Sequence, residues 1–227
     1  RLLADVVSRA WPLQLTLADG QQLWQLSLAT LAMSILAAAL AAGGGSLLSF
    51  LAARPFATER SQTWLSPLLR WASSSLLLLM RAIPAPIWAL VFLFIFFPGM
   101  LPGALALAVY NLGILGRLMA EVTENQDERP LQAIKALGAN RSAAILYGTV
   151  PAVTPRYLAY SLYRWENAIR ETVVVGLVGA GGLGRELTQQ LAAFNYRAVL
   201  ALLLCVVLLT FVVDMVSTAV RRTTRAT

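Results

Sequence analysis

The stretch from Ala198 to Val220 reads AVLALLLCVVLLTFVVDMVSTAV, and its one charged residue is Asp214. A helix needs about 20 predominantly apolar residues, at about 1.5 Å per residue, to cross the hydrocarbon core of a bilayer. This stretch is long enough, and three arginines follow it: Arg221, Arg222 and Arg225. Basic residues at the end of a span favour the cytoplasmic side. The stretch therefore predicts a membrane-spanning helix.

Four further apolar blocks follow the same pattern, at residues 23–51, 64–97, 104–119 and 151–178. The block 64–97 is too long for one straight span and contains Pro84 and Pro86, so we expect a kinked span with an interfacial first section. Overall, 58% of the residues are hydrophobic and 13% are charged, against about half and about a quarter in soluble domains. The sequence predicts an all-α polytopic membrane protein with about five visible spans.

One membrane domain accounts for the chain. We expect residues 1–22 to be an interfacial segment and residues 23–222 to form the transmembrane domain. Because the chain begins with Arg1 and the visible spans are odd in number, we also expect a sixth span upstream. The glycines of residues 43–45 predict either a close helix contact or a local bend within the first span.

The basic residues place the polar segment 121–150 and the C-terminus in the cytoplasm. Most Lys and Arg residues that flank the spans fall on that side, as the positive-inside rule requires of cytoplasmic loops. The formal charge of +7 does not indicate nucleic-acid binding, because the basic residues are spread among loops instead of lining one soluble face.

The residue types present in the chain argue against several kinds of binding and catalytic site. The chain has no His and one Cys, Cys205, which argues against disulfide frameworks and His/Cys metal sites. No G-x-x-x-x-G-K-[ST] loop is present, so we expect no nucleotide bound by this chain and no cofactor. We expect a non-catalytic protein.

A glycine-rich run follows the fourth block. Gly179, Gly181 and Gly184 spell G-x-G-x-x-G, which in a dinucleotide-binding unit needs an acidic residue about 20 positions on. Here that region is apolar. We interpret Gly179, Gly181, Gly182 and Gly184 as a tight turn or gate between membrane helices.

The polar segment contains a short helix. Pro130 precedes the helix-like stretch 131–137, and Gly138 follows it. A solvated connecting loop would also explain this pattern. Gln132-Ala133-Ile134, three residues, Gly138 and then Val150-Pro151 resemble the EAA loop of ABC-importer permeases, with Gln132 in place of the usual Glu and Gly148 in place of the usual Ile.

The resemblance extends over about residues 23–222. The stretch 160–170, YSLYRWENAIR, looks like the phosphonate-type permeases of that superfamily, while the run 179–184, GAGGLG, is shared with methionine-type permeases. The resemblance implies a type I ABC-importer transmembrane fold in the bacterial inner membrane. It also implies three partners: a cytoplasmic ATPase dimer, a periplasmic substrate-binding protein and a second permease copy or a paralogue.

The resemblance also implies which residues contact the ATPase. They are Gln132, Ala133, Lys135, Ala136, Leu137 and Gly138. The solute would be a phosphonate or a related phosphorus oxyanion. An amino acid such as methionine is the alternative solute. An ion-coupled secondary transporter and a membrane-embedded enzyme are the alternative functions, each with less support from the residues.

The fourth span carries Arg164, Glu166, Arg170 and Glu171. Charges within a span cost at least about 2.5–3.5 kcal/mol each on insertion scales, so they face a cavity or a partner. Glu166 and Arg170 are four apart and can pair on one face, while Arg164 and Glu171 lie two turns apart on another. Two interpretations stay open: an arginine that binds a passing oxyanion, or a structural ion network at the subunit interface.

Overall fold

The computed structural model describes residues 17–53, 65–127 and 129–225, and every regular element in these ranges is helical. Along the chain the elements are α2 (Leu17–Ala52), α3 (Leu65–Ala82), α4 (Ala85–Ile95), α5 (Met100–Glu124), α6 (Arg129–Ala136), α7 (Arg141–Ala144), the π-helix η1 (Ile145–Thr149), α8 (Val150–Leu177), α9 (Gly182–Ala192) and α10 (Tyr196–Arg225). The predicted all-α polytopic fold is confirmed. Most of the expected interfacial segment 1–22 lies outside the described residues, and 17–22 form the first turns of α2.

Three of the described helices are both long and apolar enough to cross a membrane: α2, α5 and α10. Helices α3 and α4 together make a fourth candidate, broken by a bend of 95°. Helix α8 has 28 residues and is long enough, but its charged side chains keep it from meeting the same apolar criterion. The expected fourth span therefore exists as a helix that composition alone does not identify.

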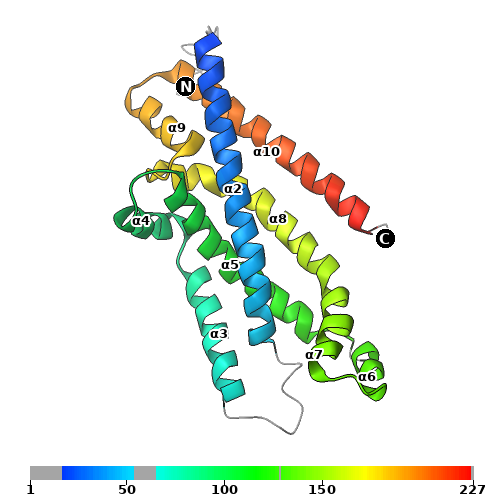
Figure 1. Cartoon of the computed structure of the whole chain (residues 1–227). Helices are drawn as coiled ribbons and strands as arrows, with labels where there is room; N and C mark the ends of the chain where they lie inside the picture. The colour runs from blue at the N-terminus through cyan, green and yellow to red at the C-terminus, as the bar shows by residue number, and fades with distance from the viewer. Residues whose placement is uncertain (1–16, 54–64, 128, 226–227) are drawn as a thin grey trace, which may run out of the picture.

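The bend in the second block falls at Pro84, the N-cap of α4. Both sections of the block pack on α5, so the interfacial first section stays a prediction. Helix α3 packs along α5, and α4 lies at an angle to α3 and packs on α5 through the buried Ala85 and Ala89 (Figure 1). Helix α3 lies close to α5 at Gly113, where a Cβ would be 2.6 Å from the backbone nitrogen of Arg81. The glycine lets the two helices approach closely.

Helix α5 occupies the centre, and α2, α3, α4 and α8 pack around it. Its buried face is built mostly from small residues, including Ala104, Ala106 and Ala108. Helix α2 runs unbroken through residues 43–45. A Cβ at Gly45 would lie 3.1 Å from the backbone nitrogen of Gly116. Of the two expected roles for these glycines, close contact is therefore the observed one.

A buried polar cluster ties three helices together. The Tyr157 hydroxyl of α8 lies 2.7 Å from the Ser49 hydroxyl of α2 and 2.6 Å from the Thr123 hydroxyl of α5. It also donates to the carbonyl oxygen of Met119, at 3.0 Å. Because lipid offers no hydrogen-bond partner, polar groups inside a membrane protein bond to each other. The cluster fixes α8 against α2 and α5.

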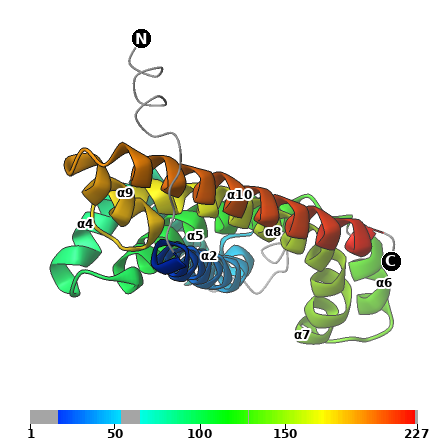
Figure 2. The same ribbon diagram turned by 90° about the horizontal axis from the view of Figure 1, so that it is seen from above.

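The two ends of the bundle differ. Helices α6 and α7 lie at one end, whereas α9 and the first turns of α2 lie at the other (Figure 1). Figure 2 shows α10 running beside α8, and the two helices are in contact. The bundle thus separates a polar end that carries α6 from an opposite end that carries the turn between α8 and α9.

Candidate coupling and ion-pair sites

Helix α6 packs on the π-helix η1 through one apolar side. A Cβ placed on Gly148 would lie 3.1 Å from Cδ1 of Ile134 and 3.6 Å from Cδ1 of Leu131. Gly148 therefore provides a shallow seat for these two side chains, because any larger residue would fill the same space. Sequence reasoning did not find η1. Short π-helical segments within α-helices frequently mark functional sites.

The opposite side of α6 faces outward. Gln132, Ala133 and Ala136 are exposed, Lys135 is half-buried, and none of the residues of α6 is buried. Leu137 directly follows the helix with 88% of its surface exposed. Gly138 ends the helix with φ +85°, a left-handed conformation that glycine adopts without a steric penalty. The structure thus brings the six residues implied by the resemblance onto one accessible surface, which we call the α6 surface.

Arg164 lies in a closed set of polar contacts between α8 and α5. Its Nε donates to Oδ1 of Asn111 at 2.7 Å, and its Nη2 contacts Oε1 of Glu171 at 2.9 Å. The Asn111 amide in turn donates to Oε2 of Glu171 at 3.1 Å. The Arg164 guanidinium also lies 5.9 Å from the centre of the Tyr110 ring. We call Arg164, Asn111 and Glu171 the α5–α8 triad.

Two ion pairs connect α8 to α10. Arg170 Nη2 lies 3.1 Å from Oδ1 of Asp214, and Arg221 Nη2 lies 2.6 Å from Oε1 of Glu166. The two helices are antiparallel. The acidic residue comes first along each of them, so each acidic residue lies opposite a basic one. A shifted register would bring like charges together, which is destabilising. The two pairs therefore specify how α10 docks on α8.

The predicted Glu166–Arg170 pair within α8 is wrong. The two residues have the expected spacing, but each is satisfied by a residue of α10 instead. Sequence reasoning assigned no role to Asp214 and treated Arg221 only as the end of the span. The available signal was the lone acidic residue in an otherwise apolar stretch, which requires a partner. The Arg164–Glu171 pair does form, across two turns of α8.

The glycine run forms the turn between α8 and α9. Gly179, Gly181 and Gly182 have φ angles of +103°, +88° and +66°. Gly184 packs on α8, because a Cβ there would overlap the carbonyl oxygen of Val173. The backbone N–H of Leu183 donates to the Thr30 hydroxyl of α2 at 2.9 Å. The turn is thereby held against the first span.

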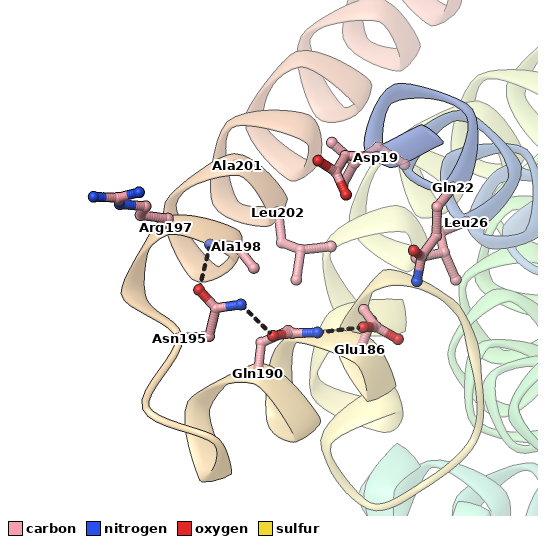
Figure 3. Close-up of a pocket in the computed structure, with 11 residues that line it drawn as sticks. Asp19, Gln22, Leu26, Glu186, Gln190, Asn195, Arg197, Ala198, Ala201 and Leu202 are labelled. Atoms are coloured by element: carbon pink, nitrogen blue, oxygen red, sulfur yellow. Dashed lines mark hydrogen bonds between the residues drawn. The ribbon is translucent and has the colours of Figure 1, made fainter. Parts of the chain in front are cut away.

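A pocket of about 260 Å³ lies at this same end, between α2, α9 and the start of α10 (Figure 3). A chain of hydrogen bonds borders it: Gln190 donates to Glu186 at 2.8 Å, and Asn195 donates to Gln190 at 3.0 Å. Asn195 in turn accepts from the backbone N–H of Ala198 at 3.4 Å, which links α9 to the first turn of α10. Neither α9 nor the pocket was expected, because residues 182–192 form a short, largely polar stretch with no apolar block of spanning length.

Comparison with known proteins identifies the class. Residues 45–226 match the family described as binding-protein-dependent transport system inner membrane component. The chain belongs to this family and is a non-catalytic ABC-importer permease.

Among proteins of known function, the chain is similar to permeases for phosphite and phosphate. The chain is 36% identical to the phosphite transport system permease protein PtxC of Stutzerimonas stutzeri over 193 residues, which are 85% of this chain and 68% of that protein. It is 32% identical to the phosphate-import permease protein PhnE of Mycolicibacterium smegmatis over 206 residues, which are 91% of this chain and 37% of that protein.

Solved structures show the same fold. An inward-facing structure of the MetNI methionine ABC transporter superposes with a TM-score of 0.78 at 18% sequence identity, over 92% of this chain and 99% of that chain. An amino acid ABC transporter structure with histidines gives a TM-score of 0.69 at 16% identity, with the same coverage of both chains.

Proposed function

We propose that this chain is the membrane subunit of an importer for a phosphorus oxyanion, such as phosphite or a phosphonate. It works as one of two copies in the bacterial inner membrane. An ATPase dimer bound to its cytoplasmic end drives the transport cycle, and a periplasmic binding protein delivers the solute to the other end. The C-terminus lies in the cytoplasm, on the side that the basic residues favour.

The exposed apolar side chain on the α6 surface carries this proposal. Leu137 is 88% exposed in a segment that the charged neighbours keep out of the lipid. A large apolar side chain held in water is a typical contact site for another protein. Its neighbours Ala133, Ala136 and Gly138 are small, so a partner can approach the helix backbone closely. These are the features of a helix that inserts into a groove of another protein.

A continuous chain of contacts can carry motion from α6 into the bundle. Ile134 and Leu131 rest in the Gly148 seat, and η1 continues directly into α8. Tyr157 then links α8 to α2 and α5. Packed helices move as rigid bodies, so a displacement of α6 is transmitted to three spans at once. This is the physical requirement for alternating access.

The substrate assignment rests on the relatives. The chain is 36% identical to a phosphite permease and 32% identical to a phosphate-import permease. The methionine transporter and the amino acid transporter with histidines share its fold at 18% and 16% identity, and a likeness at that level carries no information about the solute. A phosphorus oxyanion therefore has more support than an amino acid.

The end of α6 offers a direct test of coupling. Gly138 adopts φ +85°, a conformation that asparagine tolerates and that leucine does not. In the reconstituted importer we expect Gly138→Leu to leave ATP hydrolysis active while uptake of phosphite falls, and Gly138→Asn to retain coupling. Coupled uptake in the leucine variant equal to that of the parent protein would refute the role of α6.

A further inference from the structure

From Arg156 onward, one face of α8 is left largely uncovered by the other described residues. Its residues recur at alternating intervals of four and three, the spacing of a continuous stripe along a helix. Those left exposed or half-buried at this spacing are Arg156, Tyr160, Tyr163, Asn167, Arg170, Val174 and Leu177. We call this set the α8 stripe. At about 1.5 Å per residue, its two arginines lie about 21 Å apart along the axis.

The composition of the α8 stripe is unsuited to lipid. It presents a guanidinium, an amide and two phenol groups in the middle of a span, where each charge costs at least about 2.5–3.5 kcal/mol when it faces hydrocarbon. The exposed face of α10 is different, since it consists of apolar side chains such as Val207, Leu208 and Phe211. The α10 face suits lipid, and the α8 stripe suits a water-filled passage.

The two arginines in the middle of α8 differ in how exposed they are and in how many of their N–H donors can still bind a ligand. Arg164 has a side chain that is 13% exposed and is enclosed by the α5–α8 triad. Arg170 has a side chain that is 51% exposed. Within the described part of the chain, its guanidinium contacts Asp214 through Nη2 and the Asn167 amide through Nη1, at 3.1 Å and 3.4 Å. A guanidinium has five N–H donors, so these two contacts leave further donors on the half-exposed side chain.

We propose that Arg170, together with Asn167 and Tyr163, forms a transient binding site for an oxyanion inside the passage, and that Asp214 exchanges with the oxyanion as the partner of Arg170. This inference rests on the proposed function. The forked donors of arginine match a phosphorus oxyanion through two parallel hydrogen bonds. The Asn167 amide donates one N–H to the Tyr163 carbonyl oxygen at 3.0 Å, so its second N–H and the Tyr163 hydroxyl are the further donors on the same face.

The Asp214 carboxylate explains why the oxyanion would not remain bound. A transport site must bind its ion firmly enough to admit it and weakly enough to release it. Asp214 carries the same charge as the ion and competes for the same guanidinium. When the ion leaves, Asp214 neutralises Arg170, so the passage never holds an unpaired cation. The α5–α8 triad cannot act in this way, because Asn111 and Glu171 already enclose Arg164.

Thiol labelling tests the water-filled passage without depending on transport. Cys205 is the one cysteine of the chain, so a Cys205→Ala background accepts single cysteines at chosen positions. In the full importer we expect Tyr163→Cys and Asn167→Cys to react with a membrane-impermeant anionic methanethiosulfonate, and the control Phe211→Cys to stay unreactive. Protection of both α8 positions to the level of Phe211→Cys would overturn the proposal.

The charge preference of labelling tests the role of Arg170. At Tyr163→Cys we expect the anionic reagent to react faster than the matching cationic one. Adding Arg170→Gln should lower this ratio roughly fivefold, whereas adding Asp214→Asn should raise it, because a single charge within several ångströms changes the local concentration of ions. An unchanged ratio in both variants would refute a partner exchange at Arg170.

Uptake then separates this inference from the proposed function. In proteoliposomes that contain the complete importer and inorganic phosphite as the probe, we expect Arg170→Gln to lower uptake about tenfold or more, with stimulation of ATP hydrolysis by the binding protein preserved. Full uptake in Arg170→Gln, with the parent protein active, would refute the oxyanion site alone. Absence of phosphite uptake and of stimulated hydrolysis in the parent protein would refute the proposed function.

Discussion

Leu137 and Arg164 each lie in the surroundings that suit them least. Leu137 is an apolar side chain, 88% exposed, beside a polar helix outside the lipid. Arg164 is a charged side chain, 13% exposed, within a helix of the bundle. The difference lies in how each is compensated. Asn111 and Glu171 satisfy Arg164 within the chain, whereas the residues that the structure describes leave Leu137 exposed.

This difference separates stability from function. A buried charge that its own chain encloses stabilises one arrangement of helices, and its removal leaves a partner uncompensated. An exposed apolar side chain contributes little to the fold, and its burial by another protein is a source of binding energy. Arg170 lies between these two cases, since Asp214 pairs with it and half of its side chain stays exposed.

The largest expected effect comes from removing the Arg164 side chain from the α5–α8 triad. Arg164→Met leaves the Glu171 carboxylate without its cation, and loss of one partner from a buried ion pair destabilises a protein by about 3–5 kcal/mol. Denaturant titration of the purified permease measures this loss. Arg170→Met is the matched control, with a much smaller effect expected. Equal losses for the two variants would remove the distinction between the two arginines.

The next effect concerns the proposed contact between Leu137 and the ATPase partner. Leu137→Ser removes an apolar side chain whose burial is worth about 1.5–3 kcal/mol, so the affinity for the ATPase partner should fall at least about tenfold. The melting temperature of the permease alone should not change. Titration of the ATPase against the permease gives the affinity, and Ala139→Ser in the same segment is the control. Unaltered affinity in Leu137→Ser would place the contact elsewhere.

A smaller effect is expected at the Gly148 seat between α6 and η1. A Cβ at Gly148 would lie 3.1 Å from the end of the Ile134 side chain, so Gly148→Ala forces α6 to shift by a few tenths of an ångström at a cost of about 1 kcal/mol. We expect the ratio of solute transported to ATP hydrolysed to fall while ATPase binding persists. The double variant Gly148→Ala, Ile134→Val should recover part of that ratio. A double variant no better than the single one would argue against the seat.

The smallest expected effect tests how much the Arg170–Asp214 ion pair contributes to the stability of the fold. Half-exposed ion pairs contribute about 0–1 kcal/mol, so Asp214→Asn should change the free energy of unfolding by no more than that amount. The same denaturant titration that is used for Arg164→Met provides the comparison. A loss as large as that of Arg164→Met would make the Arg170–Asp214 pair a structural element like the α5–α8 triad.

Local patterns in the sequence predicted most of the fold. The apolar blocks gave the long helices, because span length is set by bilayer thickness. Pro130 and Gly138 bounded the short helix α6 to within two residues, and the glycine run predicted the turn after α8 because left-handed backbone favours glycine. The contact surface on α6 came from the family resemblance and the spacing of its motif, while the exposure of Leu137 is visible only in the structure.

Features that depend on packing between distant helices were not predictable. The spacing of Glu166 and Arg170 fits a pair within one helix, yet the antiparallel register of α10 supplies better partners for both. The prolines located the bend between α3 and α4, but they did not show that both helices pack on α5. Helix α9 escaped detection, since residues 182–192 show no apolar block of spanning length.

Photo-crosslinking from position 137 tests the central claim most directly. A benzoylphenylalanine placed at Leu137 in the assembled importer, with the same residue at Phe211 as the control, reports what covers each site. We predict a covalent adduct between position 137 and the ATPase subunit, and none between position 211 and that subunit. An importer that transports its solute while position 137 forms no adduct with the ATPase would contradict the account.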